Sequence, residues 1–157
     1  MAGKGIGMAI YPFTIFEKAS VSPTPGAVVY GIDHQLLPTA AVNEFEEWQV
    51  LHGDSNGITE LLIFDGNSTE AVKALERAGY HDSGKGMREL RYAVLASLDS
   101  TGQELLDKIE SVYSDFDYPR DMEPFIYYMP NDNDDPTDGP EQRFREFLHS
   151  EKAKLNL

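Results

Sequence analysis

Apolar residues recur every three or four positions along most of the chain, which is the spacing of one face of an α-helix. From this pattern we predict a mainly α fold, in which helices bury their apolar faces against each other. We expect the core to contain Leu95, Ile109, Val112, Phe116 and Trp48. The two clearest stripes run through Met87, Leu90, Arg91, Val94, Leu95 and Leu98, and through Leu105, Ile109, Val112 and Phe116.

Capping and breaking residues predict where these helices begin and end. Thr24 is placed to cap a helix that has Pro25 in its first position. Thr101 and Glu104 have the spacing of a capping box, and Gly79 is placed to terminate a helix. Helices are predicted to begin near Thr24, Thr39, Ser68, Met87, Thr101, Pro119 and Glu141.

Two short apolar segments leave a choice of structure. The segment from Tyr11 to Ala19 is predicted as a short strand or a packed N-terminal arm. The run from Ile58 to Phe64 fits a buried strand or a buried helix, and its helical neighbours favour the helix. Residues 8–157 are expected to form a single acidic helical domain, as a helical bundle or an orthogonal helix packing. Residues 1–7 are Gly-rich and are expected to be an unstructured leader or a cloning remnant.

Charge is the strongest compositional signal. The chain has 27 acidic and 13 basic residues and a net charge of −14. The part from Asp99 to Glu151 holds 15 acidic and 4 basic residues. Such a surface repels nucleic acid and anionic membranes, and it attracts basic proteins. Net charge that serves only solubility is the alternative interpretation.

The chain contains no cysteine, which excludes disulfides and thiolate metal sites and is compatible with a reducing compartment. Its first residues lack the apolar core of a signal peptide, and no apolar stretch approaches 18 residues. We therefore expect a cytoplasmic protein.

Catalytic and metal-binding motifs are not found in the sequence. It has no phosphate-binding loop, no His-Glu-x-x-His and no Gly-x-Ser-x-Gly. The acidic stretch from Asn131 to Gly139 is not an EF-hand, because a register with Gly139 sixth places Arg145 at the twelfth position instead of Glu. The histidines are far apart, at His34, His52, His81 and His149. No catalytic residue, metal or cofactor is predicted.

A segment near the end of one predicted helix interleaves aromatic and acidic side chains, and an acidic loop follows it. Tyr offers a large contact area at low entropic cost, and Asp pairs with Arg or Lys. The structural alternative packs Phe116 and Tyr118 into the core and lets Asp117 cap the next helix. The candidate binding residues are Asp115, Asp117, Tyr118, Tyr127, Tyr128, Asp132, Asp134, Asp135 and Asp138.

Two segments carry a family resemblance. Residues 113–119, Tyr-Ser-Asp-Phe-Asp-Tyr-Pro, and the later Tyr128-Met129-Pro130 resemble the C-terminal hallmark of a bacterial family of uncharacterised acidic proteins. The stretch 29–45 resembles that family's opening helix pair. Ser114 replaces an Ala of the hallmark, and Pro25 stands where Trp is expected. Families of this type look like immunity proteins for contact-dependent or polymorphic toxins.

The resemblance and the charge together favour an immunity-type protein that binds and neutralises a cognate, basic toxin. Two alternatives remain open at this stage. One is an enzyme that uses carboxylates such as Asp115 and Asp117, with or without a metal. The other is a general acidic adaptor protein without a toxin partner.

Overall fold

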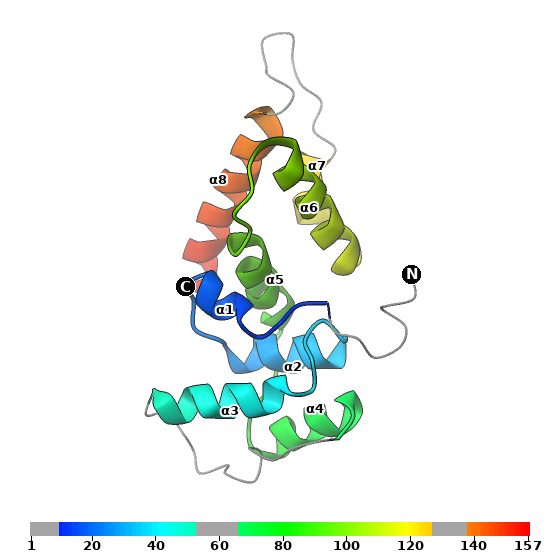
Figure 1. Ribbon diagram of the computed structural model, residues 1–157, viewed down its shortest axis with the longest axis vertical. Coiled ribbons are helices and arrows are strands. Elements are labelled where there is room, and N and C mark those ends of the chain that lie inside the picture. Colours follow the sequence, from blue (N-terminus) through cyan, green and yellow to red (C-terminus); the bar gives the residue numbers. More distant parts are fainter. Residues whose placement is uncertain (1–9, 53–65, 127–137) are drawn as a thin grey trace.

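A computed structural model describes residues 10–52, 66–126 and 138–157 of the chain (Figure 1). Within these ranges every regular element is a helix, so the predicted mainly α fold is confirmed. None of the described helices combines the length and apolar character needed to cross a bilayer. The elements are α1 (Ile15–Lys18), α2 (Pro25–Asp33), α3 (Ala41–Leu51), α4 (Ser68–Arg77), α5 (Gly86–Ala96), α6 (Gly102–Asp115), the 3-10 helix η3 (Arg120–Met122), α7 (Glu123–Ile126) and α8 (Asp138–Leu155).

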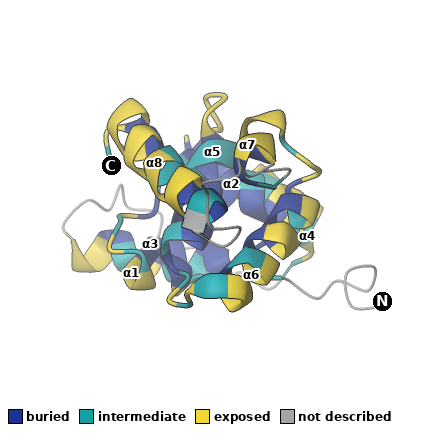
Figure 2. Cartoon of the chain, turned by 90° about the horizontal axis from the view of Figure 1, so that it is seen from above, coloured by how far each residue is buried: buried dark blue, intermediate teal, exposed yellow. Residues whose placement is uncertain are grey.

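Helix α5 lies at the centre of the packing. It packs most extensively against α2 and also contacts α1, α6 and α8, while α3 and α4 pack on α2. Figure 2 shows that α2 and α5 are largely buried and that α6 and α8 expose their outer faces. The helices α2 and α5 approach closely at Gly26 and Gly86, since a Cβ atom on Gly86 would lie 2.4 Å from the carbonyl oxygen of Gly26.

Most of the predicted core is confirmed. Leu95, Ile109, Val112 and Phe116 are each at most 4% exposed. Trp48 was wrongly assigned to the core and is only half-buried. It lies near the C-terminal end of α3, where its ring stacks on that of His52 with 4.1 Å between centroids.

The same histidine arrangement ends both α2 and α3. His34 stacks on Tyr30 as His52 stacks on Trp48, and each imidazole Nδ1 lies within 3.1 Å of the backbone oxygen of its stacking partner. Both histidines are the C-cap residues of their helices. Two of the four scattered histidines therefore help to terminate helices.

Helix caps agree with the sequence at α2 and α4 but not at α6. The Thr24 hydroxyl accepts a hydrogen bond from the Ala27 N–H, as predicted. Gly79 follows the end of α4 with φ of 96°, a value that glycine adopts without strain. The capping box predicted for Thr101 is wrong, because the Thr101 side chain makes no capping hydrogen bond. The Gly102 N–H instead donates to Glu141 Oε1 of α8 at 3.1 Å.

Several boundaries and one element type differ from prediction. The segment from Tyr11 to Ala19 contains the short helix α1 and no strand, and it packs against the core as the alternative of a packed arm predicts. The helix expected from Pro119 is divided into η3 and α7, with Pro124 in the first turn of α7, where its missing N–H costs nothing. Helix α8 begins at Asp138, before the predicted Glu141. The proposed leader, residues 1–7, and the run 58–64 lie outside the described residues.

An ion cluster built around the buried Arg91 side chain fixes the C-terminal helix α8 to α5. The Arg91 side chain is completely buried, and its guanidinium donates to both carboxylate oxygens of Asp121, at 2.6 and 2.8 Å. It also donates to Glu151 at 3.0 Å, and Glu151 accepts two further hydrogen bonds from Arg88. The two positive charges balance the two negative ones, so α8 is held by a neutral network that extends from the buried Arg91 and Glu151 to the surface at Asp121 and Arg88.

Candidate functional site

The predicted binding segment forms the C-terminal cap of α6. Phe116 is the C-cap residue, and Asp117 and Tyr118 follow with positive φ angles of 64° and 59°. The Tyr118 N–H donates to the Tyr113 carbonyl at 2.8 Å, and the Asp117 N–H donates to the Ser114 carbonyl at 3.1 Å. These are the two hydrogen bonds of a Schellman motif. Asp117 thus ends α6 and does not cap η3, whose N-cap residue is Pro119.

The cap presents its two polar residues to solvent. Tyr118 is 57% exposed, although its ring packs edge-on against that of Tyr113 with 5.3 Å between centroids. Asp117 is exposed, and it lies close enough to Tyr30 of α2 for its charge to act there. Burial raises the pKa of the Tyr30 hydroxyl, and the charge of Asp117 raises it further. Of Phe116, Asp117 and Tyr118, Phe116 alone is buried in the core. The alternative that packs both Phe116 and Tyr118 into the core is therefore confirmed for Phe116 and wrong for Tyr118.

Asp115 has an internal partner. It is half-buried and accepts a hydrogen bond of 2.6 Å from the hydroxyl of Tyr11. Burial raises the pKa of Tyr11 above its ordinary range, and the hydrogen bond to Asp115 and the charge of that carboxylate raise it further. Asp115 therefore connects the segment before α1 to the end of α6.

We expect Tyr11→Phe to lower the free energy of unfolding by about 1–2 kcal/mol, because it removes a donor to a half-buried carboxylate. Tyr118→Phe is the matched control. Its hydroxyl makes only a 3.4 Å contact with Ser114 Oγ at an exposed position, so a change within about 0.5 kcal/mol is expected. Urea unfolding followed by circular dichroism measures both. Equal midpoints for the two variants would show that the Tyr11–Asp115 bond adds no stability.

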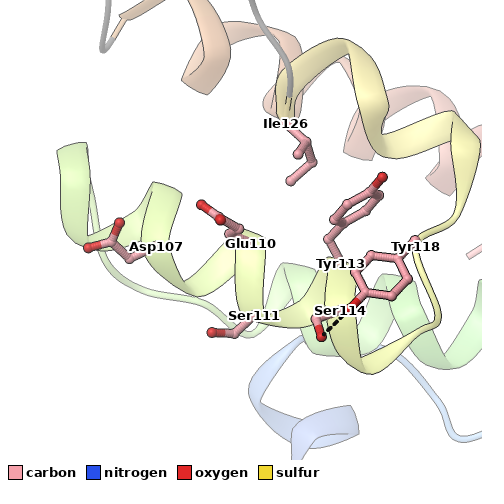
Figure 3. Close-up of a pocket in the computed structure, with 7 residues that line it drawn as sticks. All are labelled: Asp107, Glu110, Ser111, Tyr113, Ser114, Tyr118 and Ile126. Carbon is pink, nitrogen blue, oxygen red and sulfur yellow. Dashed lines mark hydrogen bonds between the residues drawn. The ribbon is translucent and has the colours of Figure 1, made fainter.

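A pocket of about 620 Å³ lies beside this cap (Figure 3). Its wall is a polar face of α6, on which two carboxylates are followed by two hydroxyls, and it is completed by two tyrosine rings and the last residue of α7. The residues that line it are Asp107, Glu110, Ser111, Tyr113, Ser114, Tyr118 and Ile126.

Of the three candidate residues whose side chains the structure describes, Tyr118 is the one that lines the pocket. Asp115 and Asp117 belong to the same cap, but Asp115 accepts a hydrogen bond from Tyr11 and the charge of Asp117 acts on Tyr30. The structure does not describe the side chains of the remaining candidates. That they form one acidic surface together with the cap therefore stays a prediction. These remaining candidates are Tyr127, Tyr128, Asp132, Asp134, Asp135 and Asp138, the last being the first residue of α8.

Sequence reasoning did not select the carboxylates of the pocket. Asp107, Glu110, Ser111 and Ser114 follow the i, i+3, i+4, i+7 spacing of one helix face, opposite the apolar stripe of α6. That spacing was available in the sequence. A polar stripe on an amphipathic helix is usually just solvated, however, so the stripe does not indicate a pocket without the fold around it.

A second, more apolar groove lies between α1 and the end of α3. Val50 and Leu51 at this end of the molecule are 51% and 75% exposed. Acidic residues lie on the groove and near it, with Glu17 in its lining and Glu47 exposed on α3. Its lining residues are Phe13, Thr14, Phe16, Glu17, Val21, Pro23, Trp48, Leu51 and His52.

Within the residues that the structure describes, no three His, Asp or Glu side chains are grouped so that they could hold a metal ion.

Residues 13–152 match the model of a family of uncharacterised proteins conserved in bacteria, DUF2247. This match covers most of the sequence, so the chain belongs to that family. No curated protein and no solved structure matches the chain.

Proposed function

We propose that this bacterial protein is an immunity-type binding protein, which neutralises a cognate, basic toxin domain in the cytoplasm by direct contact. The observation that carries the proposal is the end of α6, where an exposed tyrosine and an acidic pocket lie side by side. The cap holds Tyr118 through a backbone hydrogen bond and a ring contact. A partner that binds there meets an aromatic anchor whose position is already fixed, which reduces the entropic cost of association.

The same geometry argues against a pair of catalytic carboxylates at Asp115 and Asp117. These are the residues on which an enzymatic alternative depends. Asp115 accepts a hydrogen bond from Tyr11, while Asp117 acts electrostatically on Tyr30 of another helix. Because the Asp115 carboxylate is already engaged by Tyr11 while Asp117 is exposed, the pair favours a binding surface over a shared catalytic centre.

The net charge of −14 indicates how the partner would be recruited. Opposite charge accelerates diffusional encounter, and dissolved salt screens this attraction over about 8–10 Å. If a neighbouring gene encodes a basic toxin domain, we expect its association rate constant with this protein to fall steeply as salt is raised. The dissociation rate should change far less. Stopped-flow or surface-based kinetics across a salt series measures both rates.

Two variants with equal net charge locate the surface. The first removes four carboxylates at or after the α6 cap, and we expect it to lose association rate and affinity. The second removes four exposed carboxylates elsewhere, and we expect it to bind nearly as the parent does. Loss of binding by the second variant alone would place the interface on the early helices. The substitutions in the first are Asp117→Asn, Asp132→Asn, Asp134→Asn and Asp135→Asn, and in the second Glu17→Gln, Glu47→Gln, Glu76→Gln and Asp99→Asn.

A further inference from the structure

The pocket beside the α6 cap combines negative charge, aromatic surface and hydroxyl groups in one concave site. Asp107, Glu110 and Tyr118 are exposed in it, whereas the Tyr113 ring is 5% exposed and forms an inner wall. In Figure 3 the Glu110 carboxylate and the Tyr113 ring project from α6 on the side where Ile126 lies. None of the described lining residues is basic.

The neighbouring lysine of α6 does not neutralise this site. Lys108 donates to Ser100 Oγ at 2.6 Å and pairs with Glu104 at 3.5 Å, so it is held away from the pocket. Asp107 accepts a hydrogen bond from Gln103 at 2.9 Å, which orients its carboxylate without cancelling its charge. The pocket therefore keeps two negative charges for a ligand that carries a positive one.

The mixture of groups fits a guanidinium better than an ammonium. A guanidinium is planar, offers five N–H donors and stacks on aromatic rings, while an ammonium is compact and more strongly hydrated. Carboxylate oxygens of Glu110 and Asp107 supply acceptors, while the Ser111 and Ser114 side chains lie on the side of α6 away from Ile126 (Figure 3). Ile126 supplies apolar surface for the methylene stem of an arginine side chain.

We propose that this pocket seats an arginine side chain of a basic partner protein, with Glu110 as its main ionic contact and the Tyr118 ring as its stacking surface. The proposal rests on the proposed function, because it assumes that a basic protein is what binds. It adds the chemical identity of the anchoring side chain and the place where that side chain lies.

A small probe tests the pocket without any toxin. The full chain, labelled with ¹⁵N, is titrated with N-acetyl-arginine methylamide, and the amide shifts are followed by NMR. Parallel titrations use the citrulline analogue, which is neutral and nearly isosteric, and the lysine analogue. We expect saturable shifts at amides 107–118 with millimolar Kd for arginine, weaker binding of lysine and no saturable binding of citrulline.

Three variants complete the test. Glu110→Gln should weaken arginine binding about tenfold, as the loss of a charge-assisted hydrogen bond predicts. Tyr118→Asn removes the ring but suits the positive φ, and it should reduce the preference for arginine over lysine. Glu76→Gln, an equal charge change at an exposed position on α4, should leave binding unchanged. Shifts spread evenly over the acidic surface, equal lysine binding, or equal loss in Glu110→Gln and Glu76→Gln would each overturn the proposal.

The titration with the arginine probe and the binding experiment with the toxin test the two proposals separately. If arginine binds as expected but the neighbouring gene product does not, the pocket stands and the immunity function is wrong. If the toxin binds and Glu110→Gln binds it as tightly as the parent does, the function stands and the arginine pocket is wrong.

Discussion

Replacing Arg91 by methionine is expected to lower the free energy of unfolding by about 3–5 kcal/mol. Methionine fills much of the same space, so the loss is mainly electrostatic. The variant loses three hydrogen bonds to Asp121 and Glu151, together with the contact of the guanidinium with the Phe147 ring at 5.0 Å. Glu151 is only 3% exposed and is left with Arg88 as its sole arginine partner among the described residues.

Two companion variants separate charge from packing. Arg88→Met should cost less than Arg91→Met, because the Arg88 side chain is 34% exposed and contacts only one of the two carboxylates. Combining Arg91→Met with Glu151→Met should recover part of the loss, since the double variant also removes the buried carboxylate that has lost one of its two arginine partners. Urea unfolding at neutral pH gives all three values. A parent-like midpoint for Arg91→Met would mean that the cluster does not stabilise α8.

The Glu151 carboxyl adds a pH signature to this experiment. Burial opposes its ionisation, but the hydrogen bonds and charges of Arg88 and Arg91 outweigh burial and lower its pKa below the ordinary 4.5. Because the folded-state pKa is lowered, Glu151 contributes stability above the unfolded-state value, and this is lost as the pH falls through the folded-state pKa. The difference between the parent and Arg91→Met should therefore shrink in acid.

The helical fold could be predicted because each helix must bury an apolar face. Apolar residues therefore recur in the sequence every three or four positions. The α6 stripe correctly predicts that Ile109, Val112 and Phe116 are buried. Arg91 also lies on a predicted stripe, and its position on that face agrees with its burial. Its partners could not be predicted, because Asp121 and Glu151 lie 30 and 60 residues further along the chain.

The C-terminal ends of helices were predicted only where the residue type itself indicates the backbone conformation. Gly79 is recognisable because glycine is the usual residue at positive φ. Asp117 and Tyr118 also have positive φ angles after α6. A tyrosine in the sequence does not indicate a positive φ angle, so this helix end was not recognisable. The hallmark segment was therefore interpreted from its side chains alone. Its role as a helix cap became visible only from its hydrogen bonds.

Sequence reasoning selected residues at the end of α6, but it did not select the carboxylates of the neighbouring pocket. Tyr118 and Asp117 are exposed at the end of α6, as a binding surface requires. The carboxylates of the pocket, Asp107 and Glu110, lie one to three turns earlier on α6, where their spacing matches any solvated helix face. The pocket lies where α7 packs beside α6, an arrangement that the sequence does not reveal.

Truncation of Phe116 to alanine is expected to cost about 3–5 kcal/mol, a large share of the 5–15 kcal/mol typical of a domain. Phe116 is 4% exposed and lies 6.3 Å from the Tyr11 ring, centroid to centroid, so its loss leaves a cavity where the N-terminal segment meets α6. It is also the C-cap residue of α6. The same cavity should loosen the cap that holds Tyr118.

Phe116→Leu and Leu51→Ala provide the comparison for this variant. Phe116→Leu keeps most of the buried volume and should cost less than about 1.5 kcal/mol. Leu51 is 75% exposed, so Leu51→Ala should stay within about 0.5 kcal/mol of the parent. Thermal and urea unfolding give the stabilities, and hydrogen exchange at the Tyr118 amide reports on the cap. If Phe116→Ala melts within a degree or two of the parent, the apolar stripe of α6 does not stabilise the core as predicted. If it is destabilised but the Tyr118 amide keeps its protection relative to global unfolding, the cap is held independently of Phe116, and the arginine pocket would survive a weakened core.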